Sequence, residues 1–352
     1  MKERIESIDG LRGLACFILA FGWHYPLFDC PSITPRLVEV FVGISGFGMA
    51  YAFKDRLKDM NFSEYFGGRY FKLMPLYWVT FFCCFILQVI ALLLGKDTSV
   101  VNDCDMDFLH FIQGVAGIED GWIIGALPVN EPAWTVNVVF LCYIVYYIVC
   151  RLGKTSNNLY YGLIVFLYFL AVSCIFRRVD LPFFYYDNTM RGLASFLMGV
   201  LVCAFYKRST QNGGKFLTGV FLIFFLFYAL IMPKVLHRNF EATMGDERLL
   251  TVMFYVPTLL FIVLYFYPIK LFMETTIMQF FGKISISLYL WHWFAKMIIM
   301  YFLPNVYKSA VGSILYFLIT LLLSTLSHFY LEKYLQVLCN KILLMMFNKN
   351  RE

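Results

Sequence analysis

The sequence predicts an all-α integral membrane protein, a bundle of about ten transmembrane helices. Of the 352 residues, 61% are hydrophobic and 15% are charged, whereas a typical globular chain is about 45–50% apolar and about 25% charged. Ten apolar runs approach or reach the length of roughly 17–25 residues that a helix needs to cross a bilayer. Together these observations exclude a soluble enzyme, a disordered chain and a secreted disulfide scaffold.

The predicted spans follow one another along the chain and are separated by polar connections. They cover residues 11–28, 37–53, 74–95, 134–151, 159–176, 190–206, 216–236, 249–268, 280–303 and 310–331. Glycine and acidic residues interrupt a further apolar stretch, so we expect a re-entrant or interfacial segment near 107–128. The backbone of such a segment must be covered by protein or line a water-filled cavity. An eleventh span there is the alternative, and it would reverse the orientation of all later helices.

The distribution of lysine and arginine orients the ten spans. With the N-terminus inside, cytoplasmic segments carry 18 basic residues and the opposite side carries 8. Because cytoplasmic loops are enriched in Lys and Arg, we predict a multi-pass protein of the cell membrane with both termini cytoplasmic. We expect one transmembrane domain over residues 1–335 and a cytoplasmic C-terminal tail over 336–352.

Cysteine and charge patterns argue against a metal ion and a nucleic acid. Most cysteines lie inside apolar runs, where a thiol packs as a small hydrophobe, and no CxxC or Cys/His spacing indicates a metal. Cys30 and Cys104 fall in candidate external loops. The net charge of +6 forms no basic stripe with interleaved aromatic residues. We therefore expect membrane lipid, and no nucleic acid, among the partners.

The first span and its entry carry three ionisable residues, which are costly at membrane depth and indicate function by default. Asp9 and Arg12 open the span and His24 follows. A rise of 1.5 Å per residue places Arg12 and His24 about 18 Å apart along a helix. Histidine is suited to act as a general base because its ordinary pKa is close to ambient pH. The alternative is a histidine near the external interface that bonds to its neighbours.

Two further groups combine polar side chains at helical spacing. Arg69 and Lys72 are three residues apart and are suited to clamp phosphate groups; the alternative is a basic pair that meets anionic lipid.

The ninth span carries a polar stripe within an arc of about 60°. This stripe consists of Ser285, Tyr289, His292 and Lys296. We expect it to face a cavity shared with His24, and interhelical hydrogen bonding is the alternative.

Seven segments, taken in order, resemble the motifs of the membrane-bound acyltransferase-3 family. They are Ser7-Ile-Asp9-Gly-Leu-Arg12-Gly-Leu-Ala15 with His24, Val40-Phe41-Val-Gly-Ile-Ser45-Gly46-Phe47, Arg69-x-x-Lys72-x-x-Pro75, Pro132-Ala-Trp134-Thr135, Arg191-Gly-Leu-Ala-Ser-Phe196-Leu-Met-Gly199, Gly282-Lys-Ile-Ser285-Ile-Ser-Leu-Tyr289-Leu-Trp291-His292 and His328-Phe-Tyr-Leu-Glu332-Lys333. Each motif alone is weak evidence. Seven in the family's order, over nearly the whole chain, are strong evidence.

The resemblance implies an O-acyltransferase that moves an acyl group, usually acetyl, from a cytoplasmic acyl-CoA donor to a hydroxyl of a surface glycan or related acceptor. It implies that Arg12, Arg69 and Lys72 hold the phosphates of acetyl-CoA, with Lys72 in place of a family arginine. It also implies that His24 acts as a base or a transient acyl carrier. The residues expected to line the substrate cavity are Asp9, Ser45, Trp134 and the ninth-span stripe.

Two departures from the family pattern concern the catalytic groups. Eleven residues separate Arg12 from His24, one more than in the family, and in a straight helix this rotates His24 by about 100°. A π-bulge near Gly22 would restore its direction. Val139 occupies the position of a family glutamate, for which Glu131 is a substitute candidate.

Two rival functions remain open on the sequence. A polytopic transporter or flippase would line its path with His24 and the ninth-span stripe, but no internal repeat is visible in the chain. A catalytically inactive relative that senses a ligand is the second rival. The valine at position 139, where the family has a glutamate, favours this rival.

Overall fold

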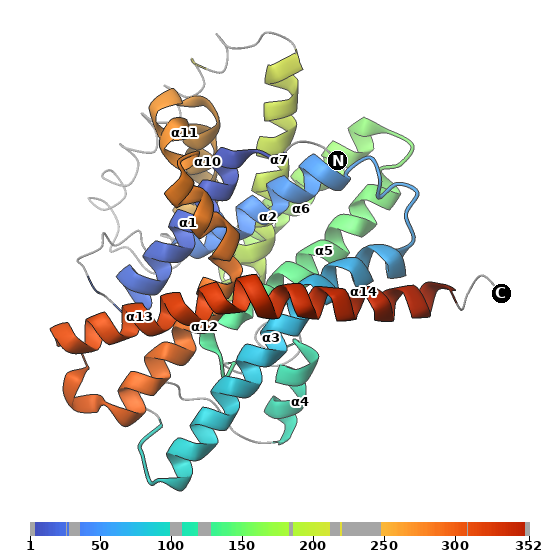
Figure 1. Cartoon of the computed structure of the whole chain (residues 1–352). Helices are drawn as coiled ribbons and strands as arrows, with labels where there is room; N and C mark the ends of the chain where they lie inside the picture. Colours follow the sequence, from blue (N-terminus) through green and yellow to red (C-terminus); the bar gives the residue numbers. More distant parts are fainter. Residues whose placement is uncertain are drawn as a thin grey trace. The chain divides into compact units, whose positions relative to one another are not determined.

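A computed structural model describes residues 4–25, 27, 36–98, 108–118, 128–182, 186–211, 219, 248–307 and 309–348. These residues form helices joined by turns and loops, with no β-strand among them, which confirms the all-α class (Figure 1). Within the described ranges, six helices are long and apolar enough to cross a membrane. They are Phe62–Leu93, Glu131–Leu152, Asn157–Arg177, Asn188–Ser209, Arg248–Tyr265 and Ala310–Cys339.

Other predicted spans also correspond to helices. Helix α2 (Leu37–Phe53) has the bounds predicted for the second span, and α12 (Thr276–Phe302) includes most of the ninth. The first span is formed by α1 (Glu6–Ile18) and the π-helix η1 (Leu19–His24). The seventh predicted span, 216–236, lies outside the described residues except for residue 219. The count of ten therefore stays a prediction.

The chain divides into two compact units, which are described one at a time. Unit 1 comprises Met1–Ala15, Arg36–Asp59 and Leu141–Gly282. Unit 2 comprises Cys16–Pro35, Met60–Phe140 and Lys283–Glu352.

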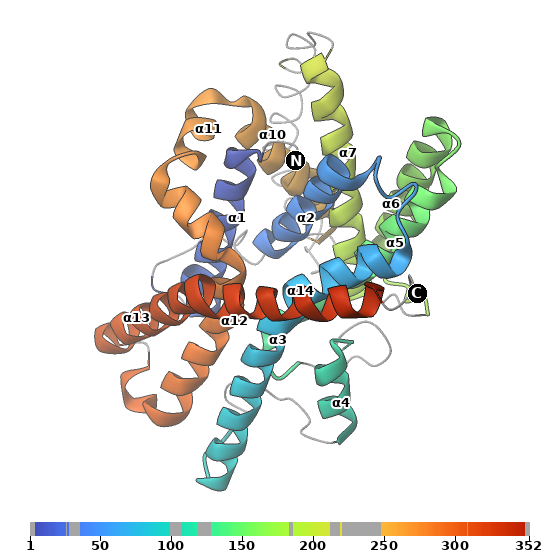
Figure 2. The ribbon, with the colours of Figure 1, turned by 45° about the vertical axis from the view of Figure 1, so that its right-hand side comes forward.

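In unit 1, α2 and α7 (Arg191–Gln211) point in the same direction and cross in close contact (Figure 2). Glu39 and Arg191 pair near the N-terminal ends of the two helices, and Lys207 donates a hydrogen bond to the carbonyl of Ala50 near their C-terminal ends at 2.8 Å. Helices α6 (Asn157–Arg177) and η4 (Tyr186–Met190) pack against α7. The elements η5 (Thr251–Tyr255) and α10 (Val256–Tyr265) also contact α7, and α11 (Tyr267–Met273) follows α10 in the chain.

Glycine residues permit the close approach of α2 and α7. A Cβ atom at Gly46 would collide with the carbonyl of Phe196, and a Cβ atom at Gly199 would collide with the carbonyl of Gly43. Small residues at membrane helix interfaces let the two backbones touch. The Ser-Gly-Phe motif of the second span therefore contributes helix packing through Gly46.

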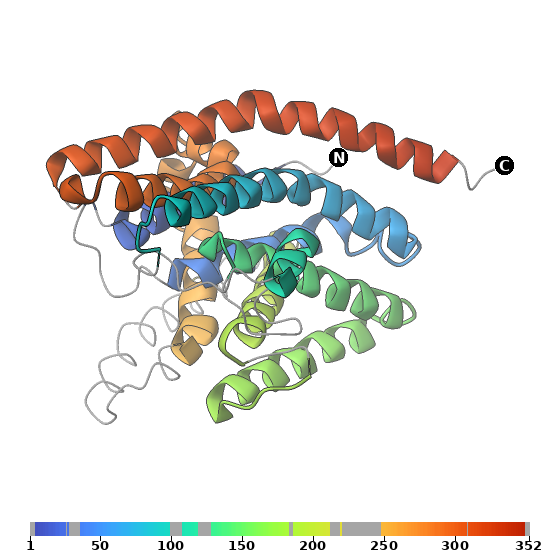
Figure 3. The ribbon, with the colours of Figure 1, turned by 90° about the horizontal axis from the view of Figure 1, so that it is seen from below.

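In unit 2, α3 (Phe62–Leu93) lies beside α14 (Glu332–Asn348), as Figure 3 shows. α13 (Ala310–Leu326) continues through the π-turn η7 (Ser327–Leu331) into α14, so these elements form one long helix. Residues 336–348 of the predicted C-terminal tail belong to α14. The side of the membrane on which they lie stays a prediction.

Helix α3 is longer than its predicted span and begins twelve residues earlier, at Phe62. Its 32 residues measure about 48 Å, against a hydrocarbon thickness of about 30 Å. The N-terminal part, which carries Arg69 and Lys72, is therefore expected to extend beyond the hydrocarbon layer.

The described part of the stretch near 107–128 is the short helix α4 (Phe108–Ala116). Its nine residues span about 14 Å, too little to cross a bilayer. Tyr77 and Trp78 of α3 each donate a side-chain hydrogen bond to a carbonyl of this segment, at Gly114 and Val115, both at 2.8 Å. The proposed re-entrant or interfacial character stays a prediction, because residues 119–127 lie outside the described part.

Candidate active site

The π-helix η1 determines the position of His24 at the end of the first span. A π-turn closes i→i+5 hydrogen bonds and takes up one residue more than an α-turn. The helix changes from α to π at Leu19 and stays π through His24, which confirms the expected π-bulge near Gly22. The hydroxyl of Tyr316 donates to the carbonyl of Ala20 at 2.7 Å, which fixes this turn against α13.

His24 forms a hydrogen-bonded pair with His292 of α12 in unit 2. Nδ1 of His24 lies 2.8 Å from Nε2 of His292, and the two ring planes are 17° apart with their centroids at 4.9 Å. His292 is fully buried, while His24 is partly exposed. Nδ1 of His292 lies 3.2 Å from the carbonyl oxygen of Leu288. We call His24 and His292 the histidine pair.

The hydrogen bonds assign the protons when both rings are neutral. A carbonyl oxygen accepts but never donates, so Nδ1 of His292 carries the proton that reaches Leu288. Nε2 of His292 is then the acceptor, and Nδ1 of His24 donates to it. Nε2 of His24 is consequently the unprotonated nitrogen. A histidine oriented in this way has the tautomer that a general base needs.

Trp293, Lys296 and Glu131 form a series of contacts in unit 2 that begins at His24. Trp293 meets the ring of His24 edge-on at 5.6 Å, and Nζ of Lys296 lies 3.8 Å from the centre of the Trp293 ring. Glu131, in the short helix η3 (Glu131–Ala133), interacts electrostatically with Lys296. The neighbouring Asn130 donates to the carbonyl of Leu290 at 3.1 Å and holds this segment against α12.

The ninth-span stripe follows its predicted face of α12. The ring of Tyr289 lies 5.8 Å from that of His292, and Tyr289 and Ser285 are both buried. The structure thus brings His24, Tyr289, His292 and Lys296 into one region through direct contacts or through Trp293. The catalytic role of these residues stays a prediction.

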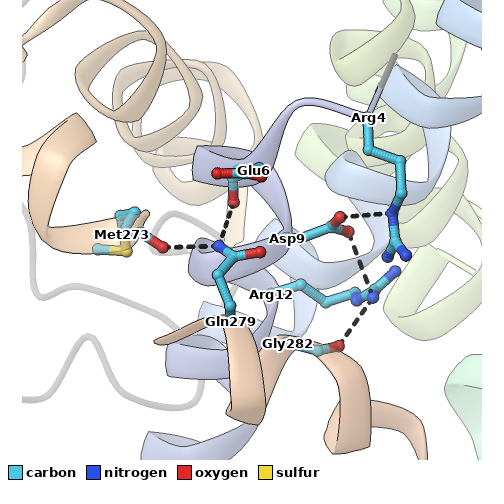
Figure 4. A network of polar contacts seen from close by, with 7 residues as sticks. All are labelled: Arg4, Glu6, Asp9, Arg12, Met273, Gln279 and Gly282. Atoms are coloured by element: carbon cyan, nitrogen blue, oxygen red, sulfur yellow. Dashed lines mark hydrogen bonds and ion pairs between the residues drawn. The ribbon is translucent and has the colours of Figure 1, made fainter. Parts of the chain in front are cut away.

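A second group of predicted residues lies at the start of α1 in unit 1 (Figure 4). Asp9 accepts a hydrogen bond from Nε of Arg4 at 2.9 Å and lies 3.3 Å from Nη2 of Arg12. The same Nη2 donates to the carbonyl of Gly282 at 2.8 Å. Gln279 donates to the carbonyls of Glu6 and Met273, both at 2.8 Å. These bonds hold the Arg12 guanidinium, whose side chain is 24% exposed, in a fixed orientation.

The remaining predicted residues fall in different units. Arg69 and Lys72 lie in α3 of unit 2, with Arg69 partly exposed and Lys72 exposed. Trp134 begins α5 (Trp134–Leu152) and also belongs to unit 2. Ser45, in unit 1, forms a hydrogen bond of 3.0 Å with the hydroxyl of Tyr143. The expected convergence of Arg12 with Arg69 and Lys72 stays a prediction.

Sequence reasoning missed Trp293, because it is one of many aromatic residues in an apolar run and no spacing distinguishes it. Glu332, from the last of the seven motifs, accepts hydrogen bonds from Ser287 and from Nδ1 of His328, the latter at 3.1 Å. The glutamate thus ties α12 to η7 and α14.

A comparison with protein families complements this geometry. A family model for acyltransferase 3, described as an acyltransferase domain, matches residues 5–331 of the 352. The match includes the Asp9–Arg12 group and the histidine pair. A comparison with curated proteins found no match.

Proposed function

Because the chain belongs to the acyltransferase-3 family and is therefore a membrane acyltransferase, we propose that it transfers an acetyl group from acetyl-CoA to a hydroxyl group of a glycan or related acceptor. The observation that carries this proposal is the hydrogen-bonded chain from His24 through His292 to the carbonyl of Leu288. It leaves a basic nitrogen on His24 in a region where ionisable groups are costly unless they function.

In the proposed reaction, Nε2 of His24 takes the proton from the acceptor hydroxyl while the hydroxyl oxygen attacks the thioester carbonyl carbon. The tetrahedral intermediate collapses, the carbon–sulfur bond breaks, and the leaving thiolate takes the proton back from His24. The products are an ester and free CoA. General base catalysis of this kind contributes about 10²- to 10⁴-fold in rate.

The other groups have supporting roles in the proposal. His292 accepts a hydrogen bond from Nδ1 of His24 and so stabilises the imidazolium that forms during proton transfer. Lys296 supplies positive charge for the oxyanion of the tetrahedral intermediate. Arg12, Arg69 and Lys72 bind the donor's phosphates; the two guanidinium groups are geometrically suited to phosphate, and Lys72 adds a positive charge. Arg12 is already oriented for this by Asp9 and Gly282.

The proposal is tested with purified protein in detergent, radiolabelled acetyl-CoA and a panel of hydroxylated sugars. We expect release of free CoA that depends on the sugar and appearance of a labelled, alkali-labile ester. Absence of thioester cleavage with every sugar, together with movement of a labelled solute in reconstituted vesicles, would favour the transporter reading instead.

A further inference from the structure

Trp293 of α12 buries a hydrogen-bond donor that the protein does not use. Its side chain is 1% exposed, and its Nε1 has no hydrogen-bond partner among the described residues. An indole N–H donates a hydrogen bond and never accepts one. Because buried polar atoms are normally hydrogen-bonded, an exception needs an explanation. The indole N–H is therefore a candidate for contact with a bound molecule.

The ring of Trp293 is held between the proposed base and a cation. It meets the ring of His24 at a centroid distance of 5.6 Å, with the two planes 85° apart. Nζ of Lys296 lies over the indole ring, 3.8 Å from its centre, and a cation in this position is attracted by the ring. These two contacts fix the ring, and with it the indole N–H, beside His24.

The other imidazole beside His24 has no proton left to donate to a substrate. Nδ1 of His292 gives its proton to the carbonyl of Leu288, and Nε2 of His292 accepts from His24. Among the described side chains in ring, hydrogen-bond or charge contact with His24, the remaining donors are Nε1 of Trp293 and Nζ of Lys296. Any oxyanion formed next to His24 is therefore expected to meet these two groups.

The proposed reaction confines the oxyanion to the surroundings of His24. The acceptor hydroxyl lies about 2.8 Å from Nε2 of His24 and attacks a carbonyl carbon from about 3–3.5 Å, and the carbonyl bond adds about 1.2 Å. The carbonyl oxygen is consequently within about 7.5 Å of Nε2. The indole of Trp293, whose ring touches that of His24, lies within this reach.

The two donors are close enough to bind one oxygen together. Two groups that share an acceptor at about 2.9 Å each can stand up to about 5.8 Å apart. Nζ of Lys296 lies 3.8 Å from the centre of the ring to which Nε1 of Trp293 belongs. The N–H lies in the plane of the ring and the ammonium lies over its face, so they approach an oxygen from different directions. Fixed donors of this kind, aimed at a developing negative charge, form an oxyanion hole.

We propose that the indole N–H of Trp293 completes an oxyanion hole with Lys296 and donates a hydrogen bond to the carbonyl oxygen of the acyl thioester. The bond strengthens as this oxygen becomes negative in the tetrahedral intermediate. Trp293 keeps its proton throughout, and no covalent bond forms or breaks at the indole. The inference rests on the proposed function, because it adds a catalytic residue to the same reaction.

The kinetic test compares two tryptophans of α12. Trp293→Phe keeps an aromatic ring beside His24 and Lys296 and lacks the N–H. Loss of one oxyanion donor lowers kcat about 10²- to 10³-fold. Because Lys296 retains part of the stabilisation, we expect kcat to fall at least tenfold and the KM for acetyl-CoA to stay nearly unchanged.

Trp291→Phe is the matched control. Nε1 of Trp291 is also buried without a partner among the described residues, but two residues place this side chain about 200° away around the helix. Its kcat should equal that of wild type. Equal losses in both variants would assign the effect to the packing of α12 and overturn the proposal.

Nuclear magnetic resonance tests the contact without turnover. In the full chain in detergent, isotope labelling of the indole nitrogens gives one N–H signal for each of the six tryptophans, and Trp293→Phe identifies that of Trp293. If this variant fails to fold, substitution of the other tryptophans one at a time identifies the signal by elimination. We expect acetyl-CoA to move the Trp293 signal to lower field, and CoA, which lacks the thioester carbonyl, to move it less. The Trp291 signal should respond to neither.

Wild-type kcat in Trp293→Phe would overturn the proposal, as would a Trp293 signal that acetyl-CoA and CoA move equally. A signal that responds to acetyl-CoA in a protein without transferase activity would refute the proposed function. The contact between Trp293 and the thioester carbonyl would then still stand.

Discussion

The histidine pair in unit 2 and the Asp9–Arg12 group in unit 1 place polar groups in an apolar chain by different physical means. The histidines are coupled by hydrogen bonds to each other and to a helix carbonyl, which fixes where each proton lies. Arg12 is held by an ion pair with Asp9 and by a hydrogen bond to the carbonyl of Gly282, which fixes where its charge lies. The first arrangement is suited to moving a proton, and the second to holding an anion. Changes in either group should therefore affect different measurements.

The largest effect among the supporting residues is expected for His292. His292→Ala removes the acceptor for Nδ1 of His24, so the tautomer of His24 is no longer fixed and kcat should fall about 10²-fold. The KM for acetyl-CoA should stay unchanged, because His292 acts through His24. His292→Gln retains a side-chain oxygen that accepts a hydrogen bond and should recover part of kcat. A fall in donor affinity with unchanged kcat would contradict this positioning role.

A smaller loss is expected at the predicted donor site. Arg69→Ala should weaken acetyl-CoA binding by about 1.5–3 kcal/mol, the value of a hydrogen bond to a charged group. Isothermal titration calorimetry measures this directly, with Arg56→Ala in the turn after α2 as a matched control. If the charge of Arg69 only sets the orientation of the helices in the membrane, the variant will show altered insertion or expression. The protein that does fold will then bind acetyl-CoA with wild-type affinity.

Helix packing in unit 1 gives a prediction on stability. Gly46→Ala places a methyl group against the carbonyl of Phe196, so α2 and α7 must separate at a cost of about 1–3 kcal/mol. Gly48→Ala is the control, because a Cβ atom there meets nothing within 4 Å. Thermal unfolding in detergent compares the two. Equal midpoints would show that the backbones do not touch at Gly46.

The smallest effect concerns an exposed ion pair outside the spans. Nζ of Lys154 donates to Oδ1 of Asp59 at 2.6 Å, and this bond lowers the pKa of the Asp59 carboxyl below its ordinary value. A carboxyl with a lowered folded-state pKa stabilises the fold above its ordinary pKa and loses that contribution as the pH falls through the folded value. Below about pH 4, the unfolding midpoint of wild type should therefore fall slightly more than that of Asp59→Asn. Parallel curves would refute the contribution.

Local patterns made much of the fold predictable. The bounds of α2, the polar face of α12 and the π-turn before His24 all follow from apolar run lengths, helical spacing and one extra residue. These features depend on neighbours in the sequence. The early start of α3 was missed, because Arg69 and Lys72 were assigned to a connection by their charge although their spacing suits a helix.

Contacts between distant segments were not predictable from one sequence. Nothing in the sequence indicates that Glu39 meets Arg191, or that Glu131 lies near Lys296. A cavity shared by His24 and the ninth-span stripe was expected from the cost of polar groups in lipid, and it stays a prediction. The direct bond between His24 and His292, and its proton order, required coordinates. The structure also shows the surroundings of Val139 and of its substitute candidate, Glu131. Val139 is buried and apolar, while Glu131 interacts electrostatically with Lys296.

The most direct test of the central claim compares His24→Ala with wild type for acetyl transfer and for acetyl-CoA binding. His110→Ala, a matched change in α4, serves as the control. We predict that His24→Ala lowers kcat by about 10²- to 10⁴-fold and leaves the Kd for acetyl-CoA, measured by calorimetry, unchanged. His110→Ala should retain both values. Wild-type transfer by His24→Ala would contradict the assignment of His24 as the base and leave the helical membrane architecture unaffected.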